Sequence, residues 1–138
     1  MTQLSKAIFV GCIDPRYQVA FHEFLVRRDL FGHHDPVQLA GGPKIFLVER
    51  SRDLALDQVH IAIYEHGVTE VYLMAHWDCL AYGGSKNFAS KELERQRYEF
   101  DLADVKALIL SHFPMVTIYE FIAVKDPDSF MVEFIHIQ

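Results

Sequence analysis

The sequence predicts a three-layer α-β-α domain with a mainly parallel central sheet and a C-terminal antiparallel hairpin. The first apolar run, residues 6–13 (KAIFVGCI), is continuous, which is typical of a strand buried on both faces of a parallel sheet. Strand-like and helix-like segments then alternate in the order β-α-β-α-β-α-β-β, the pattern of α/β proteins. A length of 138 residues suits one such domain, so residues 1–138 are expected to fold together.

The first helix is predicted from the residues that follow this strand. Asp14 is a good N-cap, and Pro15 suits the first turn of a helix. Residues 16–32 then carry apolar side chains at near-helical spacing, and Gly32 is expected to end the helix. The polar residues 33–36 are expected to form a loop.

The middle of the chain continues the alternation. A short strand is expected at 37–40, followed by a Gly-Gly-Pro turn. A long helix is predicted over 49–67, with Gly67 as its stop, and the next strand over 68–76. The stripe of this helix that is predicted to be buried consists of Leu54, Leu56, Val59, Ile61 and Ile63.

The last third of the chain predicts a loop, a helix and a hairpin. Residues 77–87 have the character of an irregular loop, and a helix is expected over about 90–112 that could be broken near Asp101. Two β-rich segments, 116–124 and 129–137, flank the sequence KDPD, whose proline favours a turn. These two strands should therefore pair antiparallel.

Composition and charge restrict the classes of partner. The formal net charge of −6 leaves no basic stripe to neutralise phosphates, which argues against nucleic acid as the main partner. No apolar run approaches the roughly 18 residues that span a membrane, so no membrane association is expected. The first apolar run is interpreted as a strand and not as a signal peptide. Two cysteines in such a chain fit a reducing compartment and predict a cytoplasmic location.

Both cysteines fall where chemistry is expected. Cys12 ends the first predicted strand, and His76 and Cys79 lie at the end of the third. Ligands of open parallel sheets bind beyond the carboxyl ends of the strands, so these side chains meet if the two strands are neighbours. Two sulfurs and one nitrogen suit tetrahedral Zn²⁺, and three protein ligands leave a fourth position for water or substrate.

Asp14 and Arg16 permit two states of such a site. If Asp14 becomes the fourth ligand, the site is closed. If Arg16 pairs with Asp14 instead, the fourth position stays available and the carboxylate can accept a hydrogen bond there. Two thiolates already cancel the charge of Zn²⁺, so a positioned carboxylate would help to activate water. The sequence leaves both states open.

These motifs together resemble the β-class carbonic anhydrases. That family carries Cys-x-Asp-x-Arg after its first strand and His-x-x-Cys after a later one, as at residues 12–16 and 76–79 here. The turn at 40–42 also resembles the family's glycine turn, and Asp78 stands where the family often has Asp. The resemblance runs over nearly the whole chain, from about Lys6 to the final hairpin.

The resemblance implies a function and a set of site residues. The activity would be reversible hydration of CO₂ to bicarbonate by zinc-bound hydroxide, and the assembly a homodimer or a higher homo-oligomer. The implied site residues are the zinc ligands Cys12, His76 and Cys79, the catalytic dyad Asp14 and Arg16, and a substrate pocket of Gln38, Ala40, Gly41 and Gly42.

The chain also departs from the family pattern. The family usually has Arg-Asn where this chain has Gln38-Leu39, and Gly where it has Leu80. The N-terminal helical extension with which many members wrap a dimer partner is not recognisable. The departures at Gln38 and Leu80 leave open the same zinc chemistry on carbonyl sulfide or carbon disulfide. Two other hypotheses also stay open: a catalytically silent zinc domain with Asp14 on the metal, and metal-free redox chemistry of the two cysteines.

Overall fold

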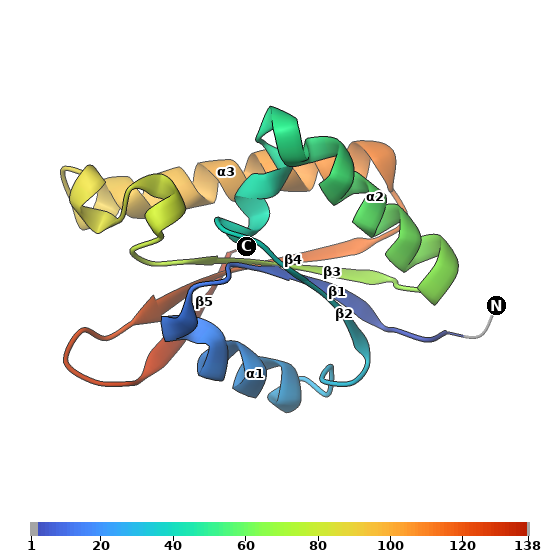
Figure 1. The fold of residues 1–138 in the computed structure, drawn as a ribbon, viewed down its shortest axis with the longest axis horizontal. Helices are drawn as coiled ribbons and strands as arrows, with labels where there is room; N and C mark the ends of the chain where they lie inside the picture. Colours follow the sequence, from blue (N-terminus) through green and yellow to red (C-terminus); the bar gives the residue numbers. More distant parts are fainter. Residues whose placement is uncertain (1–2, 138) are drawn as a thin grey trace.

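The computed structural model describes residues 3–137, which build a five-stranded sheet with helices on both faces (Figure 1). The strands lie in the order β2-β1-β3-β4-β5. The first four are parallel, whereas β4 and β5 pair antiparallel. This arrangement confirms the predicted fold class. The strand bounds are Ala7–Gly11 for β1, His34–Gln38 for β2, Glu70–His76 for β3, Thr117–Lys125 for β4 and Val132–Ile137 for β5.

Helices cover the two faces of the sheet unequally. α2 (Glu49–His66) and α3 (Lys91–His112) lie on one face, and α1 (Gln18–Arg27) lies on the other (Figure 1). Each face has its own hydrophobic cluster, because successive side chains of a strand point to opposite sides. On the α1 side, for example, the ring of Phe24 packs edge-on against Phe121 with ring centroids 5.0 Å apart.

α1 is shorter than predicted, and the segment after it is partly a strand. The helix ends at Arg27 because Asp29 adopts a left-handed backbone conformation (φ 56°), which stops the helix before Gly32. Of the residues 33–36 expected as a loop, His34 to Pro36 belong to β2. A proline is tolerated there because β2 is an edge strand, where one side of the backbone needs no ladder hydrogen bond.

α2 keeps its predicted length, but its buried face differs from the predicted stripe. Gly67 ends the helix in a left-handed conformation (φ 78°), as predicted. Leu54 and Ile61 are 56% and 43% exposed, so the prediction that they are buried is wrong. The buried face has the spacing i, i+4, i+7 and i+8, which matches one side of a helix, and consists of Ala55, Val59, Ala62 and Ile63.

α3 is one unbroken helix, so the break allowed for near Asp101 does not occur. Ser90 caps the start of the helix by accepting a hydrogen bond from the backbone N–H of Leu93 at 3.1 Å. Asp101 lies within this helix, and its carboxylate accepts hydrogen bonds from Tyr82 and Arg97. The C-terminal hairpin is confirmed, with Lys125 opposite Val132 beside the turn.

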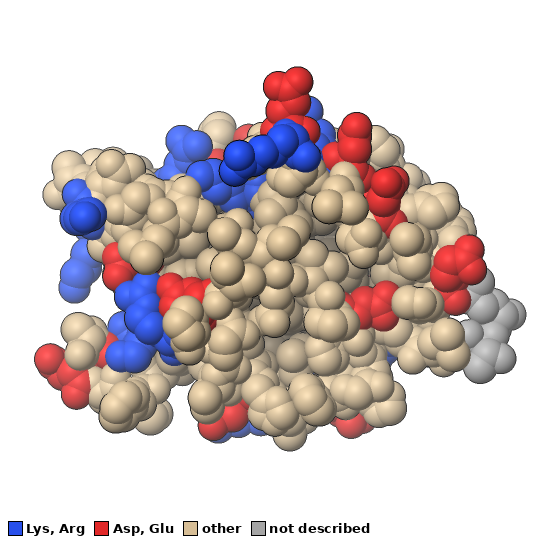
Figure 2. Space-filling model, viewed as in Figure 1, with Lys and Arg blue, Asp and Glu red and all other residues tan. Residues whose placement is uncertain are grey.

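The distribution of charged side chains and the character of the helices are relevant to nucleic acid and membranes as partners. On the face drawn in Figure 2, the described Lys and Arg side chains stand in separate groups among Asp and Glu side chains. No helix within residues 3–137 has both the length and the apolar character needed to cross a bilayer.

Candidate metal site

The site lies where two neighbouring strands end and the chain leaves toward opposite faces of the sheet. β1 and β3 pair in parallel, with Val10 beside Leu73, so their carboxyl ends share one edge. The chain leads from β1 to α1 on one face and from β3 to α3 on the other (Figure 1). Residues beyond the strand ends converge at such a switch point.

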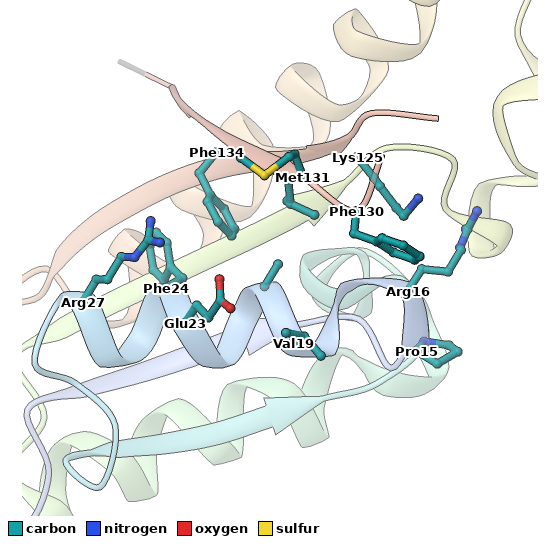
Figure 3. Close-up of a pocket in the computed structure, with 12 residues that line it drawn as sticks. Pro15, Arg16, Val19, Glu23, Phe24, Arg27, Lys125, Phe130, Met131 and Phe134 are labelled. Carbon is teal, nitrogen blue, oxygen red and sulfur yellow. The ribbon is translucent and has the colours of Figure 1, made fainter. Parts of the chain in front are cut away.

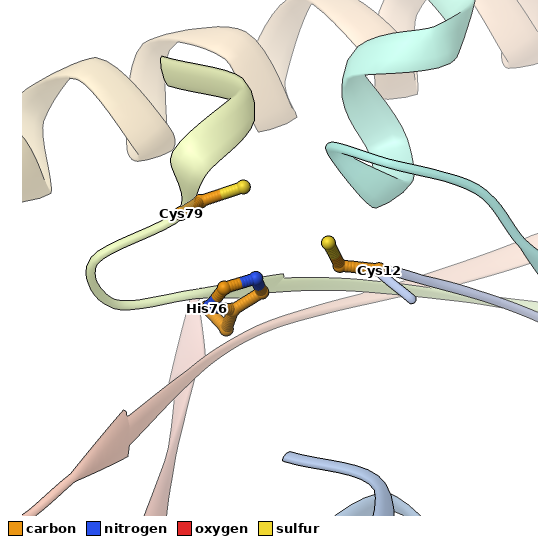
Figure 4. Close-up of side chains that lie close together, drawn as sticks. All are labelled: Cys12, His76 and Cys79. Carbon is orange, nitrogen blue, oxygen red and sulfur yellow. The ribbon is translucent and has the colours of Figure 1, made fainter. Parts of the chain in front are cut away.

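The three predicted metal ligands are brought together at this edge (Figure 4). Cys12 directly follows β1, His76 is the last residue of β3, and Cys79 comes three residues later. One ligand atom from each lies within 4.8 Å of the other two, and all three residues are at most 5% exposed. Ligand atoms around a tetrahedral zinc ion are about 3.5–4 Å apart, so a small contraction would suffice to coordinate one.

The environment of His76 fixes its tautomer. Nδ1 lies 2.8 Å from the carbonyl oxygen of Trp77, which can only accept, so Nδ1 carries a proton and the lone pair of a neutral imidazole is on Nε2. Nε2 is buried and has no hydrogen-bond partner among the described residues. The ring of Tyr17 packs against the imidazole with centroids 4.4 Å apart. A buried acceptor without a partner, next to two sulfurs, fits a metal ligand.

The two cysteines shift each other's pKa in opposite directions because their sulfurs lie within 4.8 Å of each other. The contact with Cys79 lowers the pKa of Cys12, and the backbone N–H of Gly41, 3.4 Å from the sulfur, acts in the same direction. The same contact and burial raise the pKa of Cys79. Both cysteines are free thiols. Cys12 is therefore favoured as a thiolate, which is the form that binds metals.

The glycine turn brings backbone against Cys12. Gly42 adopts φ 54°, and a Cβ atom there would lie 3.0 Å from the carbonyl carbon of Gly11 and 3.1 Å from the nitrogen of Cys12. No larger residue fits without moving one of these backbones. The close approach is what allows the N–H of the preceding Gly41 to reach the Cys12 sulfur.

Asp14 is held by Arg16 and not by the three predicted ligand residues. Arg16 Nη2 donates to Asp14 Oδ2 at 2.7 Å, and the backbone N–H of Arg16 donates to Oδ1 at 2.9 Å. The hydrogen bond from the guanidinium lowers the pKa of Asp14. Asp14 Oδ2 nevertheless lies only 3.9 Å from His76 Nε2. The carboxylate is thus ionised and lies next to the group formed by Cys12, His76 and Cys79, called the ligand cluster below. Its hydrogen bonds, however, are made with Arg16.

Arg16 is fixed from a second side by Asp78. Its Nη1 atom donates to Asp78 Oδ2 at 2.8 Å, and Nη2 also donates to the Asp78 carbonyl oxygen at 2.9 Å. Asp78 in turn accepts a hydrogen bond from the backbone N–H of Ser85 at 2.7 Å. Arg16 therefore links the loop after β1 to the loop after β3.

A family model described as "Putative carbonic anhydrase" matches residues 2–114 of the sequence. The chain belongs to this family. No curated protein matches the sequence significantly.

Solved carbonic anhydrases share the fold of this family member. The enzyme from Streptococcus mutans matches with a TM-score of 0.62 and 20% identity, over 97% of this chain and 85% of that one. The enzyme from Glaciozyma antarctica also has a TM-score of 0.62, with 16% identity over 97% and 83% of the two chains. The β-carbonic anhydrase of Coccomyxa, solved with acetazolamide, matches with a TM-score of 0.56 and 13% identity over 96% and 72%. At these identities the matches show a common fold.

The residues expected to line the substrate pocket lie around the same edge, in different environments. Gly41 and Gly42 are buried against the cluster, whereas Ala40 and Gln38 are exposed. The amide of Gln38 donates to Gln18 at 2.8 Å. The role of these four residues in holding substrate stays a prediction.

Three site residues of this carbonic anhydrase family member were missed by sequence reasoning. Tyr17 donates to the Trp77 carbonyl at 3.0 Å beside His76, and Gln18 donates to the carbonyl oxygens of Cys12 and Asp14. Nothing in the local pattern marks these two residues. Glu94, whose carboxylate accepts the backbone N–H of Asp78 at 2.8 Å, does carry a signal, because it is an acid on the buried stripe of α3.

A groove of about 820 Å³ has Arg16 of the dyad among its lining residues (Figure 3). It runs between α1 and the β4-β5 hairpin and is lined mainly by apolar side chains, Val19, Phe24 and Phe130 among them. Arg16 lies at one end of it, and none of the three ligand residues lines it. The groove therefore meets the site at the arginine.

Proposed function

We propose that this protein is a zinc-dependent lyase that catalyses the reversible hydration of CO₂ to bicarbonate. One observation carries the proposal: Cys12, His76 and Cys79 converge within 4.8 Å, while the neighbouring Asp14 is held on Arg16. Membership of the carbonic anhydrase family supports the same reaction class.

The donor set fits zinc, and each residue has a distinct task. Cys12, Cys79 and Nε2 of His76 would hold the ion. When bound, Zn²⁺ acts as a Lewis acid that makes a water molecule more acidic. The Trp77 carbonyl keeps the proton of His76 on Nδ1, and the Gly41 N–H stabilises negative charge on the Cys12 sulfur.

Asp14 would act as the hydrogen-bond acceptor that orients the reacting water. Arg16 keeps the Asp14 carboxylate ionised and fixes Oδ2 3.9 Å from His76 Nε2, so this oxygen faces the space next to the ligand cluster. A carboxylate in that place can hold the proton-bearing side of a water molecule and leave its lone pair free for CO₂. Its hydrogen bonds to Arg16 also oppose a move of Asp14 onto the metal.

The arrangement of the dyad distinguishes this proposal from a catalytically silent zinc domain. The silent reading requires Asp14 as a fourth protein ligand, which would break its contacts with Arg16. The contacts at 2.7 Å and 2.9 Å favour the state in which only three protein groups bind the metal.

The proposal is tested by measuring CO₂ hydration by stopped flow on protein with one zinc per chain. Hydration above the buffer rate is expected, and Cys79→Ser, which loses a ligand, should fall to that rate. Hydration at the buffer rate from neutral to alkaline pH would contradict the proposal. In that case product analysis with carbonyl sulfide and carbon disulfide tests the alternative substrates.

Assembly and location remain predictions. The family resemblance predicts a homodimer or a higher homo-oligomer, which sedimentation of the purified protein can measure. The predicted cytoplasmic location follows from cysteine usage alone and can be checked by fractionation.

A further inference from the structure

Side chains of α3 form hydrogen bonds with the turn at residues 77–79, which contains Cys79. Glu94 is only 1% exposed, and its Oε2 accepts the backbone N–H of Asp78 at 2.8 Å and the hydroxyl of Tyr98 at 2.6 Å. Tyr98 is equally buried, and its oxygen accepts the backbone N–H of Cys79 at 3.4 Å. Two side chains one turn apart on α3 thus accept hydrogen bonds from the consecutive backbone amides of Asp78 and Cys79.

The amide that Glu94 binds belongs to a residue with an unfavourable backbone. Asp78 has φ 58°, in the left-handed region that non-glycine residues rarely adopt. Such a conformation persists only where surrounding contacts impose it. The buried Glu94 carboxylate supplies one of these contacts, and the side-chain bonds of Asp78 to Arg16 and Ser85 supply the others.

The same turn sets the position of two parts of the site. On one side it leads to Cys79, whose sulfur belongs to the ligand cluster. On the other side it aims the Asp78 carboxylate at Arg16, which in turn holds Asp14. A shift of the Asp78 backbone would therefore move a ligand and the dyad together.

We infer that Glu94 and Tyr98 are positioning residues of the metal site, which act by fixing the backbone of Asp78 and Cys79. The inference rests on the proposed function in that it takes Cys79 as a ligand. Glu94 acts as a hydrogen-bond acceptor, so an uncharged acceptor of the same shape fulfils the same task. Loss of outer groups that orient ligands typically weakens metal binding about 10- to 100-fold.

The chain contains a matched control on the same helix. Asp101 is also a buried acid, 6% exposed, and its Oδ2 accepts the hydroxyl of Tyr82 at 2.6 Å. It has no hydrogen bond to residues 76–79 among the described contacts. Asp101→Ala therefore removes a buried carboxylate–tyrosine hydrogen bond of the same length, and it leaves both hydrogen bonds from α3 to the amides of Asp78 and Cys79 in place.

The test titrates Co²⁺ and Zn²⁺ into the full-length wild-type protein and four variants. The readouts are the affinity from chelator competition, the absorption bands of the cobalt form and the melting temperature. Glu94→Ala should bind both metals about 10- to 100-fold more weakly and shift the cobalt bands. Tyr98→Phe should also weaken metal binding and shift the cobalt bands in the same direction, but by less. Glu94→Gln should stay near wild type in both readouts. Asp101→Ala should lower the melting temperature without changing the metal readouts.

The outcomes separate this inference from the proposed function. Wild-type affinity and cobalt bands in both Glu94→Ala and Tyr98→Phe would overturn the inference, as would equal losses in Asp101→Ala. If Glu94→Ala does not fold, the metal affinities and cobalt bands of Tyr98→Phe and Glu94→Gln are compared. Weaker binding and shifted bands in Tyr98→Phe alone support the inference, and wild-type values in Tyr98→Phe overturn it. If the metal effects appear but the zinc-loaded wild type does not hydrate CO₂, the positioning role stands and the proposed function fails. A wild type that binds neither metal overturns both.

Discussion

Replacing Asp14 by Asn separates its role as a proton-directing group from a role as a metal ligand. The two side chains have the same shape, and the asparagine oxygen can still accept the backbone N–H of Arg16 at 2.9 Å. The charge-assisted bond from Arg16 Nη2 at 2.7 Å is lost. A hydrogen bond to a charged group is worth about 1.5–3 kcal/mol when buried, and Arg16 is 41% exposed and keeps Asp78 as a partner. We therefore expect a loss of about 1 kcal/mol in the free energy of unfolding.

The effect on catalysis should be much larger than the effect on stability. A positioned proton acceptor contributes about 10²- to 10⁴-fold to a rate, so kcat for CO₂ hydration should fall by at least about 10²-fold. Zinc content and zinc affinity should stay near wild type, because Asp14 is not one of the three proposed ligands, Cys12, His76 and Cys79. The assays are stopped-flow hydration, metal analysis and urea denaturation of the same preparations. Asp14→Asn protein that loses its zinc, or that keeps wild-type kcat, would refute this reasoning.

Three further predictions concern a ligand, the glycine turn and a buried acid. Cys79→Ser should abolish stoichiometric zinc, since a serine hydroxyl is a poor zinc ligand; one retained zinc per chain by metal analysis would speak against Cys79 as a ligand. Gly42→Ala should cost about 1–3 kcal/mol in urea denaturation, because φ is 54° and the new Cβ would lie 3.0 Å from backbone; an unchanged midpoint would contradict the close approach. Glu120 is 6% exposed, and burial raises its pKa above the ordinary 4.5. The folded state therefore keeps this proton to a higher pH than the unfolded chain does, so the free energy of unfolding falls as pH rises from about 4.5 through the folded pKa. Glu120→Gln should lack this fall and be more stable than wild type at neutral pH; parallel pH profiles of the two proteins would exclude the effect.

Most of the fold could be predicted because hydrophobic pattern and turn chemistry agree. The continuous apolar run before Cys12 and the KDPD turn each specify one structure. The elements that were predicted at wrong positions are those whose sequence signal is weak or is outweighed by their place in the folded chain. The start of β2 was missed because Pro36 argues against a strand, yet an edge position removes the objection.

The buried face of α2 was misjudged for a different reason. Large apolar side chains at Leu54 and Ile61 dominate the sequence pattern, but the close packing of the helix on the sheet uses the smaller Ala55 and Ala62. Near Asp101 the sequence could not show that Tyr82, 19 residues earlier, would satisfy the carboxylate within a continuous helix.

The convergence of Cys12 with His76 and Cys79 could be predicted because parallel strands place their carboxyl ends at one edge. The state of Asp14 could not, since Arg16 and the ligand cluster are both within reach of its carboxylate. The contribution of Glu94 depends on a contact with Asp78, 16 residues away, which only the folded chain reveals.

Identification of the metal and its ligands, by X-ray absorption and anomalous scattering at the zinc edge, tests the central claim most directly. The expected result is one zinc per chain bound by the sulfurs of Cys12 and Cys79 and by Nε2 of His76, with a fourth ligand from outside the protein and Asp14 on Arg16. Protein that takes up no metal, or a zinc ion bound without Cys12, would contradict the claim.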